Sequence, residues 1–166
     1  MATGPEFVAR MMGLHDELDR RFFAHQRALL DRDFARAARE LDAYRERLAR
    51  HMHDEESLVL PRYAQCGGDA GDAPVRLFRG EHDKMRTFVA DFAQRVAALQ
   101  RTPDDRALLE LFDREATYKN LVLHHDLRER NALYPTLAAA LPPAEQHAVL
   151  AQLAWSGDAP GAPARD

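Results

Sequence analysis

The sequence has 166 residues, which is the size of one ordinary domain and enough to bury a hydrophobic core. Hydrophobic residues make up 46% of it and charged residues 30%, the balance of a soluble globular protein. The net charge of −4 gives no reason to expect nucleic acid or an anionic membrane as a partner, and no apolar run is long enough to span a bilayer.

The first two predicted elements are helices, because apolar residues recur at steps of three and four and no strand-like alternation persists. The first helix is predicted over roughly 5–29. The second is predicted over roughly 33–60, with Asp31 or Asp33 as its N-cap. We expect this helix to stop at Pro61, because proline cannot continue the hydrogen-bond ladder of a helix.

The next segment, 61–74, is rich in glycine, aspartate and proline, which predicts a loop. It contains Cys66, the only cysteine, so the chain forms no internal disulfide and no cysteine-based metal site. A lone cysteine is typical of a reducing compartment, and the N-terminal segment MATGPEFVARMMG is too short and too polar for a secretory signal. The sequence therefore predicts a cytoplasmic protein in which Cys66 is an incidental thiol.

The second half of the chain repeats this helical arrangement. A third helix is predicted over roughly 74–100 and a fourth over roughly 103–134. We expect Thr102 and Pro103 to cap the fourth helix and Pro135 to end it.

A short helix is predicted near 143–154, and the Gly/Ala/Pro-rich segment 156–166 is predicted to be a disordered tail. We therefore expect one domain over 1–155. Long helices with mostly short links predict an all-α fold, an antiparallel up-down-up-down four-helix bundle with a short C-terminal helix.

A sequence repeat joins the second and fourth predicted helices. One contains His51-x-x-x-Glu55 and the other His125-x-x-x-Glu129, and the two motifs are 125 − 51 = 74 residues apart. Residues i and i+4 share one face of a helix, so each motif offers an imidazole and a carboxylate to the same point.

Polar residues interrupt the apolar stripe of every long helix at a comparable place. The histidines are one per helix, and two helices add a glutamate one turn later; these six residues are His15, His51, Glu55, His82, His125 and Glu129. By contrast, the remaining histidines outside the stripes are expected to face solvent; these are His53, His124 and His147.

The six residues predict a metal site, because a buried carboxylate without a compensating charge costs several kcal/mol. Two carboxylates that bridge, with two imidazoles for each ion, make a dinuclear centre. Nitrogen and oxygen ligands without thiolate suit iron, manganese or zinc. The alternative is a buried network of His–Glu hydrogen bonds without metal, because a single core histidine is more often structural than a ligand.

With these motifs, the chain over about residues 8–140 resembles the hemerythrin-like, HHE cation-binding family. Its segments HMHDEESLVLP and HHDLRERNALYP are similar to the two signature stretches of that family. The resemblance implies a non-haem centre of two iron ions with an oxo or hydroxo bridge. It assigns His15 and His51 to one iron and His82 and His125 to the other, with Glu55 and Glu129 as bridges.

One departure from the family pattern concerns the third helix. Oxygen-carrying hemerythrins have a second histidine four residues after the first one there, and this sequence has Arg86. Each iron then has two histidines and room for a further ligand. The four-histidine, two-glutamate pattern is similar to the branch that acts in iron-centre repair and nitric-oxide response.

A second polar layer is predicted beyond the metal ligands. Four stripe positions lie toward one end of the bundle; these are His25, Tyr44, Glu115 and Tyr118. We expect them to lead from the metals toward one mouth, where they could relay protons, admit ligands or donate an electron through a tyrosine. The alternative is a buried His–Glu pair with two tyrosines that only fill space. A dry wall beside the metals is predicted from Leu18, Leu48, Leu58, Met85 and Val122.

Three classes of function remain open at this point. The protein could bind or sense dioxygen or nitric oxide, or handle iron for damaged clusters. It could be an enzyme that reduces peroxide or nitric oxide with an external reductant, because no flavin, haem or nucleotide motif is present. It could also be an interaction protein that holds zinc or no metal. Signalling would need a partner protein.

Overall fold

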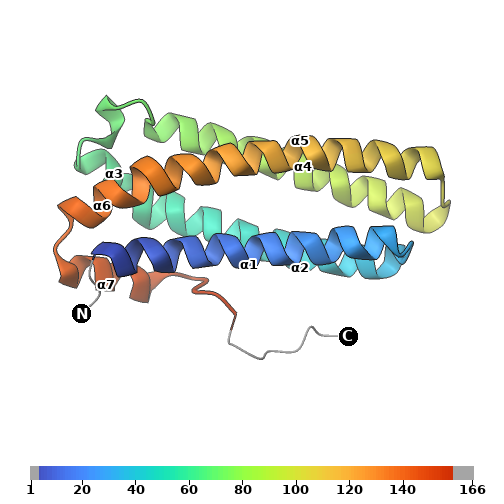
Figure 1. Ribbon diagram of the computed structural model, residues 1–166, viewed down its shortest axis with the longest axis horizontal. Coiled ribbons are helices and arrows are strands. Elements are labelled where there is room, and N and C mark those ends of the chain that lie inside the picture. Colours follow the sequence, from blue (N-terminus) through green and yellow to red (C-terminus); the bar gives the residue numbers. More distant parts are fainter. Residues whose placement is uncertain (1–3, 159–166) are drawn as a thin grey trace.

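The computed structural model describes residues 4–158, and in that range it is all-α (Figure 1). Four long helices form an antiparallel bundle: α1 (Gly4–Leu30), α2 (Phe34–Asp54), α4 (Val75–Arg101) and α5 (Asp105–Arg128). The α1–α2 and α4–α5 turns lie at one end, and the short helices lie at the other: α3 (Leu60–Gln65), α6 (Tyr134–Ala140) and α7 (Pro143–Gln152). The predicted fold class is confirmed.

Aspartate side chains cap the N-termini of two of the long helices. Asp33 accepts a hydrogen bond from the Arg36 N–H at 2.9 Å, as predicted for an N-cap. The expected cap of the fourth helix is wrong. Asp104 accepts from the Ala107 N–H at 2.7 Å and α5 begins one residue later, while Thr102 ends α4. Asp104 caps the helix in place of Thr102, because a negatively charged side chain is favourable at a helix N-terminus.

The expected helix ends at Pro61 and Pro135 are also wrong. A π-helical turn continues α2 over Glu55–Val59 into α3, and another continues α5 over Glu129–Leu133 into α6. Each turn makes an i→i−5 hydrogen bond. Because the register changes there, each proline lies in the first turn of a new α segment, where its missing N–H is not needed.

The two π turns also displace the buried stripe. An α-helical continuation would place Leu58 and Ala132 on the buried face, but both are only half-buried. Leu60 and Tyr134, which lie five residues after the glutamates, are instead fully buried. A π turn holds more residues than an α turn, so position i+5 returns to the face of position i.

Residues 153–158 form a strap that follows α7 and crosses the outside of α1 and α2 (Figure 1). The buried carboxylate of Asp54 accepts the backbone N–H groups of Ala154 and Trp155 at 2.9 and 3.1 Å. Asp158 pairs with Arg21 and Arg47. The first residues of the predicted tail 156–166 therefore have defined contacts, and 159–166 lie outside the described residues.

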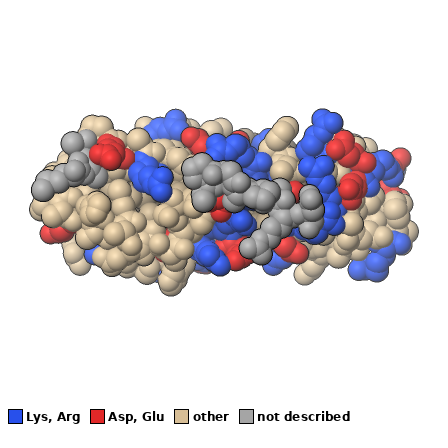
Figure 2. All heavy atoms as spheres, turned by 90° about the horizontal axis from the view of Figure 1, so that it is seen from below, with Lys and Arg blue, Asp and Glu red and all other residues tan. Residues whose placement is uncertain are grey.

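The surface that carries the strap has mixed charge. Figure 2 shows lysine and arginine beside aspartate and glutamate on this face, more densely on the half away from α7. Within residues 4–158, none of the helices has the length and apolar character that a membrane crossing requires.

Candidate metal centre

The six predicted residues converge in the interior of the bundle, and all six are buried. Their ligand atoms form two groups, each within 4.8 Å of one another. One group is His15, His51, Glu55 and Glu129, and the other is Glu55, His82, His125 and Glu129. The two groups therefore share the two glutamates, and each has its own pair of histidines.

Each glutamate directs one carboxylate oxygen to each histidine pair. For Glu55, Oε1 lies 3.6 Å from His51 Nε2, and Oε2 lies 3.3 Å from His82 Nε2. For Glu129, Oε2 lies 3.1 Å from His15 Nε2, and Oε1 lies 2.9 Å from His125 Nε2. Both carboxylates therefore span the two halves, which is the arrangement that a pair of bridging ligands requires.

The positions of the ring nitrogens and carboxylate oxygens are suited to binding metal cations. His15 Nε2 and His51 Nε2 lie 3.0 Å apart and face the same space. Among the described residues, Glu55 Oε2 and His82 Nε2 are buried without a hydrogen-bond partner. Unpaired buried polar atoms are costly, and cations between these atoms would satisfy them together.

The first pair of supporting contacts lies behind His82. Its Nδ1 donates to Glu56 Oε1 at 2.8 Å, and the same oxygen accepts from Arg86 at 2.7 Å. Burial raises the pKa of Glu56, but Arg86 and His82 outweigh burial and lower it. Arg86, which departs from the oxygen-carrier pattern, therefore fixes the carboxylate that orients His82.

The same arrangement supports His125. Its Nδ1 donates to Glu81 Oε2 at 2.9 Å, and Glu81 Oε1 accepts from Arg128 at 2.6 Å. A carboxylate that accepts from the outer nitrogen of a ligating imidazole fixes its tautomer and raises its basicity. Both histidines of this half therefore have a carboxylate held by an arginine behind them. Sequence reasoning missed these glutamates, although each lies within four residues of a predicted ligand.

The other half of the centre is supported differently. His15 Nδ1 lies 3.3 Å from Asp126 Oδ1. His51 Nδ1 has no hydrogen-bond partner among the described residues, and the Trp155 ring packs edge-on against His51 at 6.3 Å between centroids. The two histidine pairs therefore lie in unequal surroundings.

Tyr134 is a further site residue that the sequence analysis missed. Its hydroxyl donates to Glu55 Oε1 and lies 3.1 Å from His15 Nε2 and 3.3 Å from Glu129 Oε2. Burial and then the charges of Glu129 and Glu55 raise its pKa well above its usual value, so it remains a phenol. Tyr134 closes the side of the centre that faces α6. Only the π turn places it there, since an α-helix would direct this position away.

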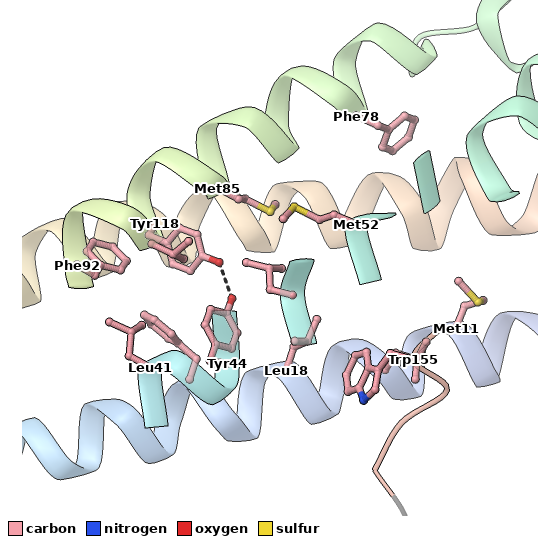
Figure 3. Packing of buried hydrophobic residues seen from close by; sticks show 14 of the residues in the cluster. Met11, Leu18, Leu41, Tyr44, Met52, Phe78, Met85, Phe92, Tyr118 and Trp155 are labelled. Atoms are coloured by element: carbon pink, nitrogen blue, oxygen red, sulfur yellow. Dashed lines mark hydrogen bonds between the residues drawn. The ribbon is translucent and has the colours of Figure 1, made fainter. Parts of the chain in front are cut away.

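A cavity of about 390 Å³ lies on the opposite side of the centre and is lined by all four histidines. The cavity continues to Tyr44 and Tyr118, whose hydroxyl groups hydrogen-bond to each other. Phe92 and Leu41 lie on one side of this pair, and Met52 and Met85 lie on the other (Figure 3). Four of the five predicted wall residues line it: Leu18, Leu48, Met85 and Val122. The fifth, Leu58, does not, because of the π turn that precedes it.

The other two members of the predicted polar layer form a separate pair. His25 Nε2 lies 2.8 Å from Glu115 Oε1, and His25 Nδ1 donates to the Ala37 carbonyl at 2.8 Å. Neither residue lines the cavity. Exposed lining residues from α1 and α5, such as Asp19 and Lys119, place its mouth between these helices, not at the end of the bundle.

The chain matches a known protein family over most of its length. The family model of the hemerythrin HHE cation binding domain matches residues 6–137, a range that includes all six converging residues. Searches of curated proteins and of solved structures gave no match.

Proposed function

The chain belongs to the hemerythrin family of HHE cation-binding domains, and from this premise we propose that it binds two iron ions and, at those ions, a diatomic ligand such as dioxygen or nitric oxide. The main support for this proposal is that Glu55 and Glu129 each direct one carboxylate oxygen to each histidine pair. Nitrogen and oxygen donors without thiolate suit iron in a dinuclear site.

In this proposal His15 and His51 hold one ion, His82 and His125 hold the other, and the glutamates bridge. Iron supplies the affinity for a diatomic molecule, which side chains alone lack. The chain's own residues supply the geometry: Tyr134 holds Glu55 by a hydrogen bond and closes one side. The cavity leaves the opposite side accessible.

A metal count and a visible spectrum test this function. Protein purified from iron-replete cells without chelator should contain about two irons per chain, with absorption that changes when azide or oxygen is added. One ion per chain, or zinc in place of iron after growth in iron-rich medium, would contradict the proposal.

Metal binding should release protons at pH 7. In the metal-free protein, burial lowers the pKa of His15, but the charges of Glu129, Asp126 and Glu55 outweigh burial and raise it to about 9. Burial also lowers the pKa of His125, and Glu129 and Glu81 raise it well above its usual value. Both imidazoles are therefore protonated at pH 7, and a metal ion that takes Nε2 displaces a proton from each.

The release is measured by calorimetric titration of the metal into the protein in two buffers of different ionisation enthalpy. We expect the two imidazoles to contribute about two protons per chain at pH 7, in addition to any released by metal-bound water, and fewer as the pH rises toward the pKa of His15. Apparent metal affinity should correspondingly increase with pH over this range. A release that does not depend on pH would show that these imidazoles are already neutral.

A further inference from the structure

The cavity beside the metal centre is larger than a diatomic ligand needs. Its volume is about 390 Å³, whereas a water molecule, which is of similar size to a diatomic, occupies roughly 30 Å³ of liquid. Pockets that bind organic molecules run from roughly 300 to 1,000 Å³. The volume therefore matches an organic ligand.

The middle of the cavity is apolar. Its wall comes from all four long helices: Leu18 of α1, Leu48 of α2, Met85 of α4 and Val122 of α5. Met52 and Met85 extend toward each other in the interior (Figure 3). Such a wall binds hydrocarbon, because burying each CH₂ group is favourable by roughly 0.8 kcal/mol.

The two ends of the cavity are polar. The metal-facing end has the four imidazoles, and the other end has Tyr44 and Tyr118. Each tyrosine precedes its histidine, His51 or His125, by seven residues, which corresponds to about 10 Å along a helix. The hydrocarbon wall therefore lies between two polar ends at a defined spacing.

The tyrosine end can donate a hydrogen bond to a ligand. Two phenols that bond to each other share one hydroxyl hydrogen, so the second hydroxyl hydrogen remains available. Both side chains are buried, and burial raises the pKa of each, so both stay protonated. No other partner of either hydroxyl occurs among the described residues.

The mouth does not select for one sign of charge. It carries Lys119 and Arg130 together with Asp16, Asp19 and Asp126. Selection by charge therefore falls to the proposed metal centre, where two bound cations would carry more positive charge than two glutamates neutralise.

We propose that the cavity binds a medium-chain aliphatic carboxylate with a second oxygen at its far end, as in an ω-hydroxy acid. The carboxylate meets the metal centre, the alkyl chain lies against the apolar wall, and the far oxygen accepts from the Tyr44–Tyr118 pair. This inference rests on the proposed metal centre, because the cations provide the charge that the carboxylate needs.

The test uses iron-loaded protein and three probes: acetate, octanoate and 8-hydroxyoctanoate. Calorimetric titration should show octanoate binding about 100-fold or more tightly than acetate, because six further CH₂ groups are buried. The hydroxy acid should bind several-fold more tightly than octanoate, as expected for one further hydrogen bond. Each acid should also shift the visible absorption of the iron centre.

Two variants locate the binding. Val122→Phe fills the wall and should weaken octanoate at least tenfold while leaving acetate unchanged. Leu121→Phe is its control, because Leu121 is a similarly half-buried neighbour that does not line the cavity. Circular dichroism and the iron content establish that both variants fold and load.

The outcomes separate this inference from the metal proposal. Two irons per chain with equal affinities for acetate and octanoate would overturn the inference and leave the metal centre intact. Equal affinities for octanoate and its hydroxy form would overturn the role of the tyrosine pair. Fewer than two metals per chain would overturn the metal centre and, with it, the carboxylate end of this proposal.

Discussion

Replacing Glu55 or Glu129 should abolish the proposed paired metal binding. In Glu55→Ala or Glu129→Ala, both histidine pairs lose a carboxylate oxygen at once, because each glutamate faces both pairs. The loss should exceed the roughly 10–100-fold cost of removing a group that only supports a ligand. Metal analysis after desalting should therefore find less than one tightly bound ion per chain in each variant.

His53→Ala is the matched control, because His53 lies two residues from Glu55 but is exposed. It should keep the full metal content of the natural protein. Circular dichroism should show helical content in all three variants, because the apolar core does not depend on these carboxylates. Full metal content in both glutamate variants would contradict the ligand assignment.

Replacing Glu81 with glutamine should weaken one metal position much more than the other. The buried carboxylate of Glu81 accepts from His125 and is held by Arg128, so the amide would lower the basicity of that imidazole and leave an arginine without its counterion. We expect a roughly 10–100-fold loss of affinity for the ion that His82 and His125 would hold in the proposed centre. Stepwise metal titration should resolve this loss.

Glu46→Gln provides the comparison for this experiment. Glu46 also pairs with an arginine, Arg50, but on the exposed surface and without a histidine behind it. Its replacement should leave both metal affinities unchanged, since an exposed ion pair contributes little. Equal weakening of both metal positions in Glu81→Gln would show that the two positions do not titrate separately.

The four long helices could be predicted from the sequence because apolar periodicity reports directly on buried helix faces. The helix bounds could not, since Pro61 and Pro135 terminate an α-helix but are accommodated after a π turn. No propensity scale distinguishes EESLV or ERNAL from an α-helical turn.

The inner residues of the site were more predictable than its surroundings. His51-x-x-x-Glu55 and its repeat share a helix face whatever the tertiary structure, so their convergence follows from spacing. Glu81 acts across a helix interface, on the imidazole of His125, and spacing says nothing of such contacts. The side chain of Tyr134 reaches the centre only through the π turn.

The strap has a practical consequence for spectroscopy. Trp155 is the only tryptophan of the chain, and its ring lies against His51. The emission of this indole should therefore respond to a paramagnetic ion bound at His51 in the proposed centre. Its brightness should therefore follow metal loading of the centre, and most strongly the filling of the half that contains His51, with no external dye.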